Sequence, residues 1–186
     1  IGALLMVLRL RGESDAEIAG FTAAFRASTR NLPKADLDWP SYAAGRSRGA
    51  PLFVLAAKLV ALAGYRVALH GWNAHQREGA DLREVLQDLQ LEGEGLAYYP
   101  LEQLSPAGFD LLALRNRLGL RSCINTVLRM WNPCGAQASV QGVFHPSYRG
   151  LQSRAAALLG DRTLTVIKGG GGEFDRHPGK DVAIFG

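Results

Sequence analysis

A segment with two arginines, PSYAAGRSRGAP (residues 40–51), stands between a short apolar run and the next apolar stretch of the chain. In proteins that alternate strands and helices, a glycine-rich segment at this position holds phosphate, because backbone N–H groups and the helix N-terminus attract anions. This segment has only two glycines, one of them Gly45, and it adds the cations Arg46 and Arg48. These residues predict phosphate contact by arginine side chains. The alternative is an ordinary solvated loop.

A second group of basic residues follows further along the chain. Two residues apart on one helix, Arg115 and Arg117 cannot point the same way, and we expect at least one arginine of the group to form a structural ion pair. Together they indicate an anion-binding face. Lys168 precedes four glycines and could belong to an anion-binding turn, although a mobile loop explains it equally well. The four arginines of the group are Arg115, Arg117, Arg121 and Arg129.

Three aromatic residues and one histidine could add to such a site. Tyr42, Trp72 and Trp131 have flat rings on which nucleic-acid bases could stack, although burial is the commoner fate of such side chains. His70 stands beside Leu69 and Trp72, which favours a structural histidine over a catalytic one. We therefore assign no catalytic residue.

The sequence does not indicate metal or disulfide chemistry. Glu173 and Asp175 share one side of an extended segment, but no further ligands accompany them, so no metal site is assigned. Cys123 and Cys134 form no CxxC pair and have no histidine at metal-ligand spacing, which favours two reduced thiols.

The composition is that of an ordinary globular protein, with a mild bias towards an anionic partner. The 186 residues are 47% hydrophobic and 20% charged, with a formal net charge of +4. Of the 21 basic residues four are lysine and 17 arginine, the side chain that matches phosphate bidentately. GC-rich coding is the alternative explanation. The longest apolar stretch, residues 51–64, is too short to cross a bilayer, so we expect a cytoplasmic protein without membrane contact.

The two ends of the chain suggest a piece of a longer protein. The start IGALLMVLRLRG lacks an initiator Met and also lacks the basic beginning and cleavage site of a signal peptide, so we expect a packed helix there. The end DVAIFG follows directly on a predicted strand, residues 181–185. We therefore expect further segments on both sides.

Hydrophobic patterns predict an α/β fold, with a mostly parallel sheet flanked by helices. Residues 1–30 form two helices, the second with a capping box at Ser14–Glu17, and are expected to be the remnant of a small helical domain. A linker covers residues 31–38, and residues 39–186 form a partial α/β domain. Strands are predicted at 37–41, 65–71, 96–100, 138–144, 163–169 and 181–185, and helices at 51–63, 81–91, 105–118 and 145–159.

Ligands of such sheets bind beyond the carboxyl ends of the strands. This rule places four predicted loops on one side of the sheet, and the functional residues are expected there. The loops cover residues 41–50, 70–79, 120–135 and 168–180.

Several motifs in order resemble the anthranilate phosphoribosyltransferase family, glycosyl transferase family three. They are GALLMVLRLRGESDAEIAGF, VALHG, LRNRLGLRSCINTVLRMWNPCGA, VQGVFHPSY and TVIKGGGGEFD. The resemblance implies a nucleoside phosphorylase-like fold with a helical domain through which two copies form a homodimer. It also implies that the family's first helices and much of its C-terminal half lie outside this chain.

The phosphate-binding motifs of that family are altered here. The GTGGD diphosphate loop falls on SYAAG (residues 41–45), and the NIST motif falls on PLFV (residues 51–54). Leu69 replaces a lysine, Leu128–Arg129 replaces a Gly-Pro pair, and the magnesium-binding Asp-Glu pair falls on Phe174–Asp175. The matching positions of the substrate pocket are Gly45, His70, Gly71 and Arg115, with Arg115 at the arginine that contacts the anthranilate carboxylate.

A chain that keeps the family's other motifs but has altered phosphate-binding motifs resembles the YbiB-type branch of the family, whose members bind DNA. The sequence thus predicts a non-catalytic homodimer that binds nucleic acid without sequence preference and without a cofactor. The predicted phosphate contacts are Arg46, Arg48, Arg115, Arg121, Arg129 and Lys168. The alternative is a divergent phosphoribosyl or glycosyl transferase that uses Mg²⁺ and an acidic or aromatic acceptor held by Arg115. A sensor of a small anionic metabolite is a third possibility.

Overall fold

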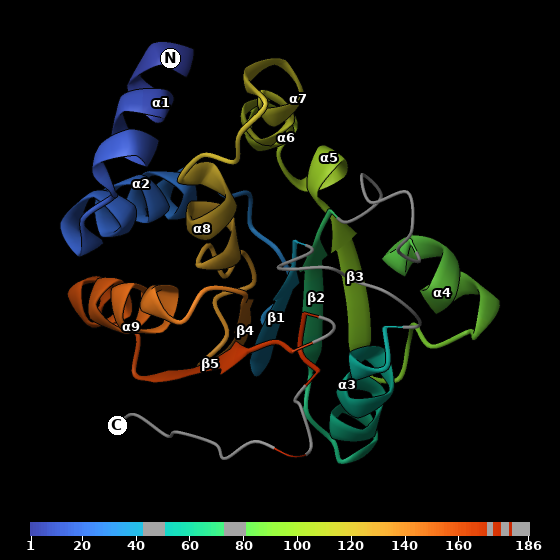
Figure 1. The fold of residues 1–186 in the computed structure, drawn as a ribbon. Helices are drawn as coiled ribbons and strands as arrows, with labels where there is room; N and C mark the ends of the chain where they lie inside the picture. Colours follow the sequence, from blue (N-terminus) through green and yellow to red (C-terminus); the bar gives the residue numbers. More distant parts are fainter. Residues whose placement is uncertain (43–50, 73–80, 171–172, 176–178, 180–186) are drawn as a thin grey trace.

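The computed structural model describes residues 1–42, 51–72, 81–170, 173–175 and 179 (Figure 1). Within this part of the chain, five parallel strands form one sheet in the order β3-β2-β1-β4-β5. The predicted fold class is therefore confirmed. All strands end on the same side, which we call the carboxyl end of the sheet, and begin at its amino end. The strands are β1 (Leu37–Ser41), β2 (Val67–Gly71), β3 (Leu96–Pro100), β4 (Ala138–Val143) and β5 (Thr163–Lys168).

The two faces of the sheet differ in polarity because side chains alternate along each strand. Trp39 and Leu69 belong to the apolar face, which packs against α3 (Phe53–Leu62) and α4 (Leu82–Asp88). The opposite face carries a row of buried and half-buried polar side chains. This row comprises Asp38 of β1, His70 of β2, and Ser139 and Gln141 of β4.

The helices on the polar face form one core with the N-terminal helices. Helix α1 (Gly2–Arg11) and helix α2 (Asp15–Ala27) contribute Leu5 and Ile18 to one apolar cluster. This cluster also contains residues of α8 (Ile124–Arg129) and α9 (Ser147–Leu159). Both halves of the predicted capping box at the start of α2 are present, with the Glu17 N–H donating to Ser14 Oγ at 3.2 Å. The N-terminal helices thus pack directly on the α/β part (Figure 1).

One predicted loop holds a helix instead. Residues 120–135 contain α8 (Ile124–Arg129), and all six of its residues are buried. A helix that is covered on every side lacks the one-sided apolar pattern by which helices are recognised in a sequence. The loop prediction for this segment was therefore wrong, and α8 lies between the sheet and the N-terminal helices.

Other boundaries differ by smaller amounts. The helix predicted over 105–118 is divided into α6 (Pro106–Ala113) and α7 (Arg115–Leu118), and α5 (Leu101–Leu104) precedes it. Strands β2 and β5 and helix α4 are shorter than predicted. The strand predicted at 181–185 lies outside the described residues. Among the helices described, none is long and apolar enough to cross a membrane.

Candidate anion-binding site at the carboxyl end of the sheet

The ends of β1 and β2 approach each other closely at Gly71. This glycine has φ of 148°, and a Cβ atom there would lie 1.8 Å from the carbonyl oxygen of Ser41. The same Ser41 carbonyl accepts a hydrogen bond from the Trp72 N–H at 3.1 Å. Any side chain at position 71 would separate the two strand ends, so Gly71 shapes the floor of the site.

A buried carboxylate occupies the start of the segment that follows β1. Glu173 accepts hydrogen bonds from the hydroxyl of Ser41 at 2.7 Å and from the backbone N–H of Tyr42 at 3.0 Å. Gly142 of β4 makes room for it, because a Cβ there would lie 2.7 Å from Glu173 Cγ. An acidic side chain of the protein therefore already uses the first N–H group beyond β1.

Arg129 is the cation nearest to this carboxylate. Its Nη2 lies 3.9 Å from Glu173 Oε1, and both side chains are buried. Burial lowers the pKa of Arg129, whereas the charge of Glu173 raises it. The prediction that Arg129 contacts nucleic acid is wrong for this structure, because α8 places its side chain inside the protein. The sequence predicted that at least one arginine of the group forms a structural ion pair, and Arg129 forms such a pair with Glu173.

The other arginines of the group lie nearer to the surface. Arg115 and Arg121 are half-buried and Arg117 is exposed. Burial and then the charge of Arg121 lower the pKa of Arg115, and burial also lowers the pKa of Arg121. Arg115 Nη1 is buried and has no hydrogen-bond partner among the residues that the structure describes. Guanidinium groups that are partly desolvated and repel one another favour the binding of an anion.

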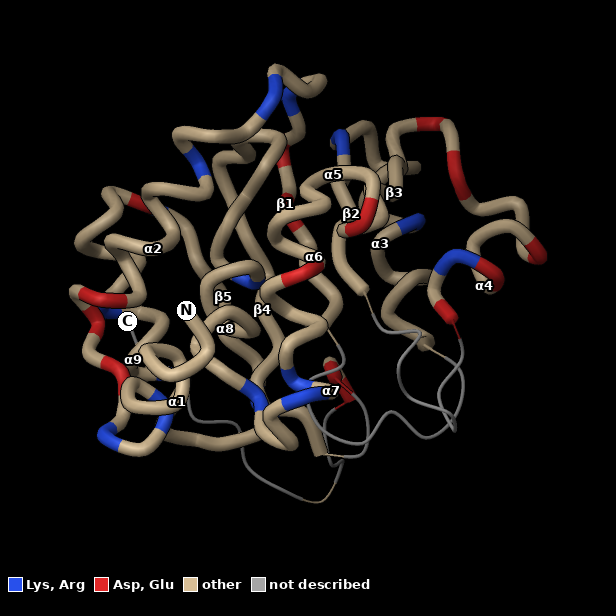
Figure 2. The backbone as a smooth tube through the Cα atoms, turned by 90° about the horizontal axis from the view of Figure 1, so that it is seen from above, with Lys and Arg blue, Asp and Glu red and all other residues tan. Residues whose placement is uncertain are grey.

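Figure 2 views the molecule from above and shows Lys and Arg positions at α7. The strands point towards this side in Figure 1. Gly45, Arg46 and Arg48 lie outside the described residues, so their predicted contacts stay predictions.

His70 belongs to the buried polar row and does not reach the surface. Its Nε2 lies 3.1 Å from Asp38 Oδ1, and its Nδ1 lies 3.1 Å from the hydroxyl of Tyr42. Ser139 donates to Asp38 Oδ2 at 2.9 Å and accepts from Gln141 Nε2 at 3.3 Å. The row thus runs from Gln141 to Tyr42, and His70 is a structural link in it.

The aromatic residues available for stacking differ from those singled out in the sequence. Tyr42 and Trp131 are buried, and Trp131 Nε1 donates to Thr29 at 2.6 Å. Phe144, which directly follows β4, is instead 44% exposed, and the Lys168 ammonium lies 5.8 Å from its ring centroid. Its place between a strand and a His-Pro pair was the signal that could have marked Phe144 as exposed.

The described residues offer little for a metal ion. Among them no three His, Cys, Asp or Glu side chains gather closely enough to hold one. Glu173 is engaged by Ser41, Tyr42 and Arg129, so it is not available as a ligand in this arrangement. Cys123 and Cys134 are both free thiols, and burial raises the pKa of each to about 11.

Comparison with known proteins agrees with this architecture. Residues 1–29 match the helical bundle domain of a glycosyl transferase family. The anthranilate phosphoribosyltransferase of Thermus thermophilus has a similar structure, with a TM-score of 0.78 and 31% identity, over 91% of this chain and 56% of that one. The chain thus has the phosphoribosyltransferase fold of that enzyme.

Sequence relatives are consistent with this fold. The anthranilate phosphoribosyltransferase of Chromobacterium violaceum is 30% identical over 90% of this chain and 54% of its own length. An uncharacterized protein of Aquifex aeolicus is 29% identical over 98% of this chain and 60% of its own length. These matches support the predicted family. The chain spans somewhat more than half the length of these relatives.

Proposed function

We propose that the protein binds nucleic acid at the carboxyl end of the sheet, without sequence preference, and that its phosphoribosyl-diphosphate site no longer supports transfer. The observation that carries the proposal is the position of Glu173. Its carboxylate accepts the Tyr42 N–H at the place where the resemblance puts the diphosphate loop. A diphosphate there would meet a like charge, which weakens binding of the donor substrate.

The cations around this carboxylate suit a polyanion. Arg115, Arg117 and Arg121 come from α7 and the turn after it, and Lys168 ends β5. Side chains of this kind contact backbone phosphates, and binding then weakens steeply as salt rises. Phe144 beside Lys168 adds an exposed ring on which a base can stack. The proposal follows the YbiB-type branch that the sequence resembles.

The test is a fluorescence-anisotropy titration of a labelled single-stranded oligonucleotide at several salt concentrations. For the Arg117→Gln/Arg121→Gln/Lys168→Gln variant, we expect weaker binding and a log–log salt slope reduced by about 2, since each contact with a single strand contributes roughly 0.7. The matched control, Arg30→Gln/Lys34→Gln/Arg66→Gln, removes equal charge from exposed residues outside the site. Equal weakening in both variants, or no binding at low salt, would count against the proposal.

A second candidate function is a divergent transferase with an acidic acceptor. The unpartnered Nη1 of Arg115 favours it, because a buried guanidinium N–H lacks the carboxylate that would satisfy it. Turnover of phosphoribosyl diphosphate with Mg²⁺, lost in Arg115→Gln, would establish the transferase. Salt-sensitive oligonucleotide binding without turnover would establish the nucleic-acid-binding protein.

The predicted homodimer is part of the proposal, and α1 supplies the surface for it. Leu5 and Leu8 face the core, whereas Leu4, Val7 and Leu10 are exposed to 55, 59 and 82%. An apolar stripe of this kind gains stability when a second copy covers it. We expect light scattering to show a dimer and the Val7→Asp variant to be monomeric. A monomeric wild-type protein would exclude dimerisation through this stripe.

A further inference from the structure

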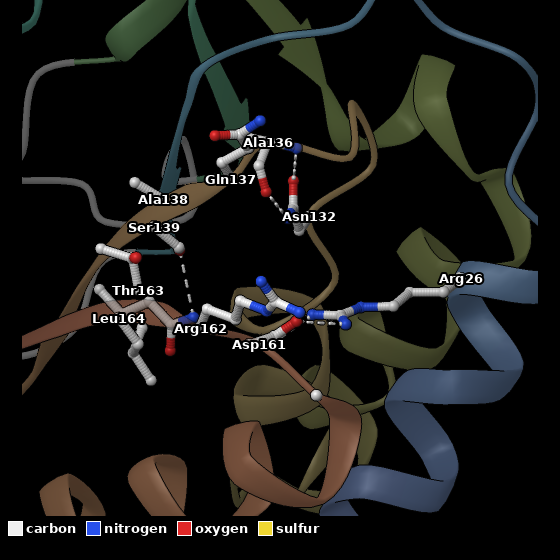
Figure 3. A pocket seen from close by; sticks show the side chains of 12 residues that line it. Arg26, Asn132, Ala136, Gln137, Ala138, Ser139, Asp161, Arg162, Thr163 and Leu164 are labelled. Carbon is white, nitrogen blue, oxygen red and sulfur yellow. Dashed lines mark hydrogen bonds and ion pairs between the residues drawn. The ribbon is translucent and has the colours of Figure 1, made fainter.

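A pocket of about 430 Å³ opens at the amino end of the sheet, on the opposite side from the arginine site. It lies beside the starts of β4 and β5, and every residue that lines it is described (Figure 3). Its volume falls within the range of small-molecule sites. The site proposed above uses none of its side chains.

One buried residue that lines the pocket has a polar atom without a partner. Gln141 is 2% exposed, and its Oε1 makes no hydrogen bond with any residue that the structure describes. Its amide is held in place because Nε2 donates to Ser139 Oγ at 3.3 Å. A buried carbonyl oxygen without a donor is costly, so a ligand hydroxyl or N–H that reaches it would gain binding energy.

The outer wall is rigid and cationic. The Arg26 guanidinium donates to both carboxylate oxygens of Asp161 at 2.7 Å, which fixes these two side chains. Arg162 is exposed and forms no ion pair within the described part of the chain. Figure 3 shows the side chains of Arg26, Asp161 and Arg162 converging at one end of the pocket. Two guanidinium groups against one carboxylate leave this wall with one positive charge in excess.

The remaining wall is preorganised by a closed loop. The Asn132 side chain donates to the Ala136 carbonyl at 2.8 Å and accepts from the Ala136 N–H at 2.8 Å. Asn132 itself has a left-handed φ of 52°. A loop closed in this way keeps its shape when the pocket is filled, which reduces the entropy lost on binding.

We propose that this pocket binds a compact anion that also carries hydroxyl groups. Its phosphate or carboxylate pairs with Arg162, and a hydroxyl donates to Gln141 Oε1. A hydroxylated phosphate and a hydroxylated carboxylate each carry an anionic group and a hydroxyl donor. Arg162 matches the anionic group, and Gln141 Oε1 matches the hydroxyl. This site is separate from the nucleic-acid site and stands or falls independently of it.

The test uses ¹⁵N-labelled full chain and NMR titration with glycerol 3-phosphate, with glycerate, and with glycerol as the uncharged control. We expect saturable shifts of the Ser139 and Thr163 amides and of the Gln141 side-chain amide with at least one anion, and none with glycerol. Whichever anion binds identifies the ligand as a phosphate or a carboxylate. Arg162→Ala is expected to raise the dissociation constant about tenfold, as is usual for a lost charge-assisted contact.

Two further variants keep the test sharp. Gln141→Leu removes the unpartnered oxygen at similar volume and is expected to weaken binding severalfold, whereas Arg30→Ala, an exposed arginine that does not line the pocket, leaves it unchanged. The proposal is overturned if neither anion gives saturable shifts, if glycerol shifts the same signals, or if Arg162→Ala binds as the wild type does.

Discussion

The Glu173→Gln variant is expected to lose about 3 kcal/mol of unfolding free energy, because it leaves the buried charge of Arg129 without its counterion. The Glu173 and Arg129 side chains are only 4 and 6% exposed, so water screens little of the interaction. A glutamine keeps the shape and can still accept from Tyr42, so the loss reports mainly on the charge. Urea unfolding followed by circular dichroism measures the loss.

The matched control for this experiment is Asp175→Asn, which removes an exposed carboxylate two residues further along the same segment. Its effect should stay within about 0.5 kcal/mol, as is usual for surface substitutions. If Glu173→Gln behaved like this control, the ion pair with Arg129 would not contribute to stability. The proposal that Glu173 places a negative charge where the diphosphate would bind would then lose its main support.

The Arg26→Ala variant is expected to lose roughly 2–4 kcal/mol, because one guanidinium joins α2 to two separate segments. It donates to Asp161 twice, to the Trp131 carbonyl at 3.0 Å and to the Met130 carbonyl at 2.8 Å. These carbonyls belong to the C-cap residue of α8 and to the residue after it, where helix carbonyls need partners outside the helix. Arg26→Lys should lose most of the same stability, since an ammonium cannot reproduce the planar fork.

A double-mutant cycle with Asp161→Asn separates the ion pair from the two carbonyl contacts. We expect a coupling energy of about 1–2 kcal/mol between positions 26 and 161, within the range for residues in direct contact. Arg30→Ala, four residues further along, serves as the control and should be near neutral. A coupling energy near zero would mean that the carbonyl contacts alone account for the effect of Arg26.

The sequence predicted the sheet well because its strands carry strong local signals. The strands at Leu37–Ser41 and Leu96–Pro100 have the predicted bounds, and the capping box at Ser14 marks the start of α2. Helix α8 was missed because its residues are buried on all sides, so no polar face reveals the period of the helix. Local patterns therefore identify elements at the surface more readily than those enclosed by others.

The rule that ligands bind at the carboxyl ends of parallel strands predicted the loops that hold Arg121 and Lys168. Arg115 lies in a predicted helix, residues 105–118, and was singled out by the family resemblance. The sequence could not show that Arg129 is buried, because this follows from the packing of α8 against β1. Nor could it place Glu173 against Tyr42, since 131 residues separate them.

The shared core has a consequence for folding during synthesis. Arg26 of α2 meets its hydrogen-bonding partners across 104 to 135 residues of sequence. At ordinary rates of translation, those partners leave the ribosome roughly 5 to 25 s after Arg26 does. For that time the apolar faces of α1 and α2, with Leu5 and Ile18, have no α8 or α9 to cover them. The N-terminal helices can therefore complete this packing only after α8 and α9 have been synthesised.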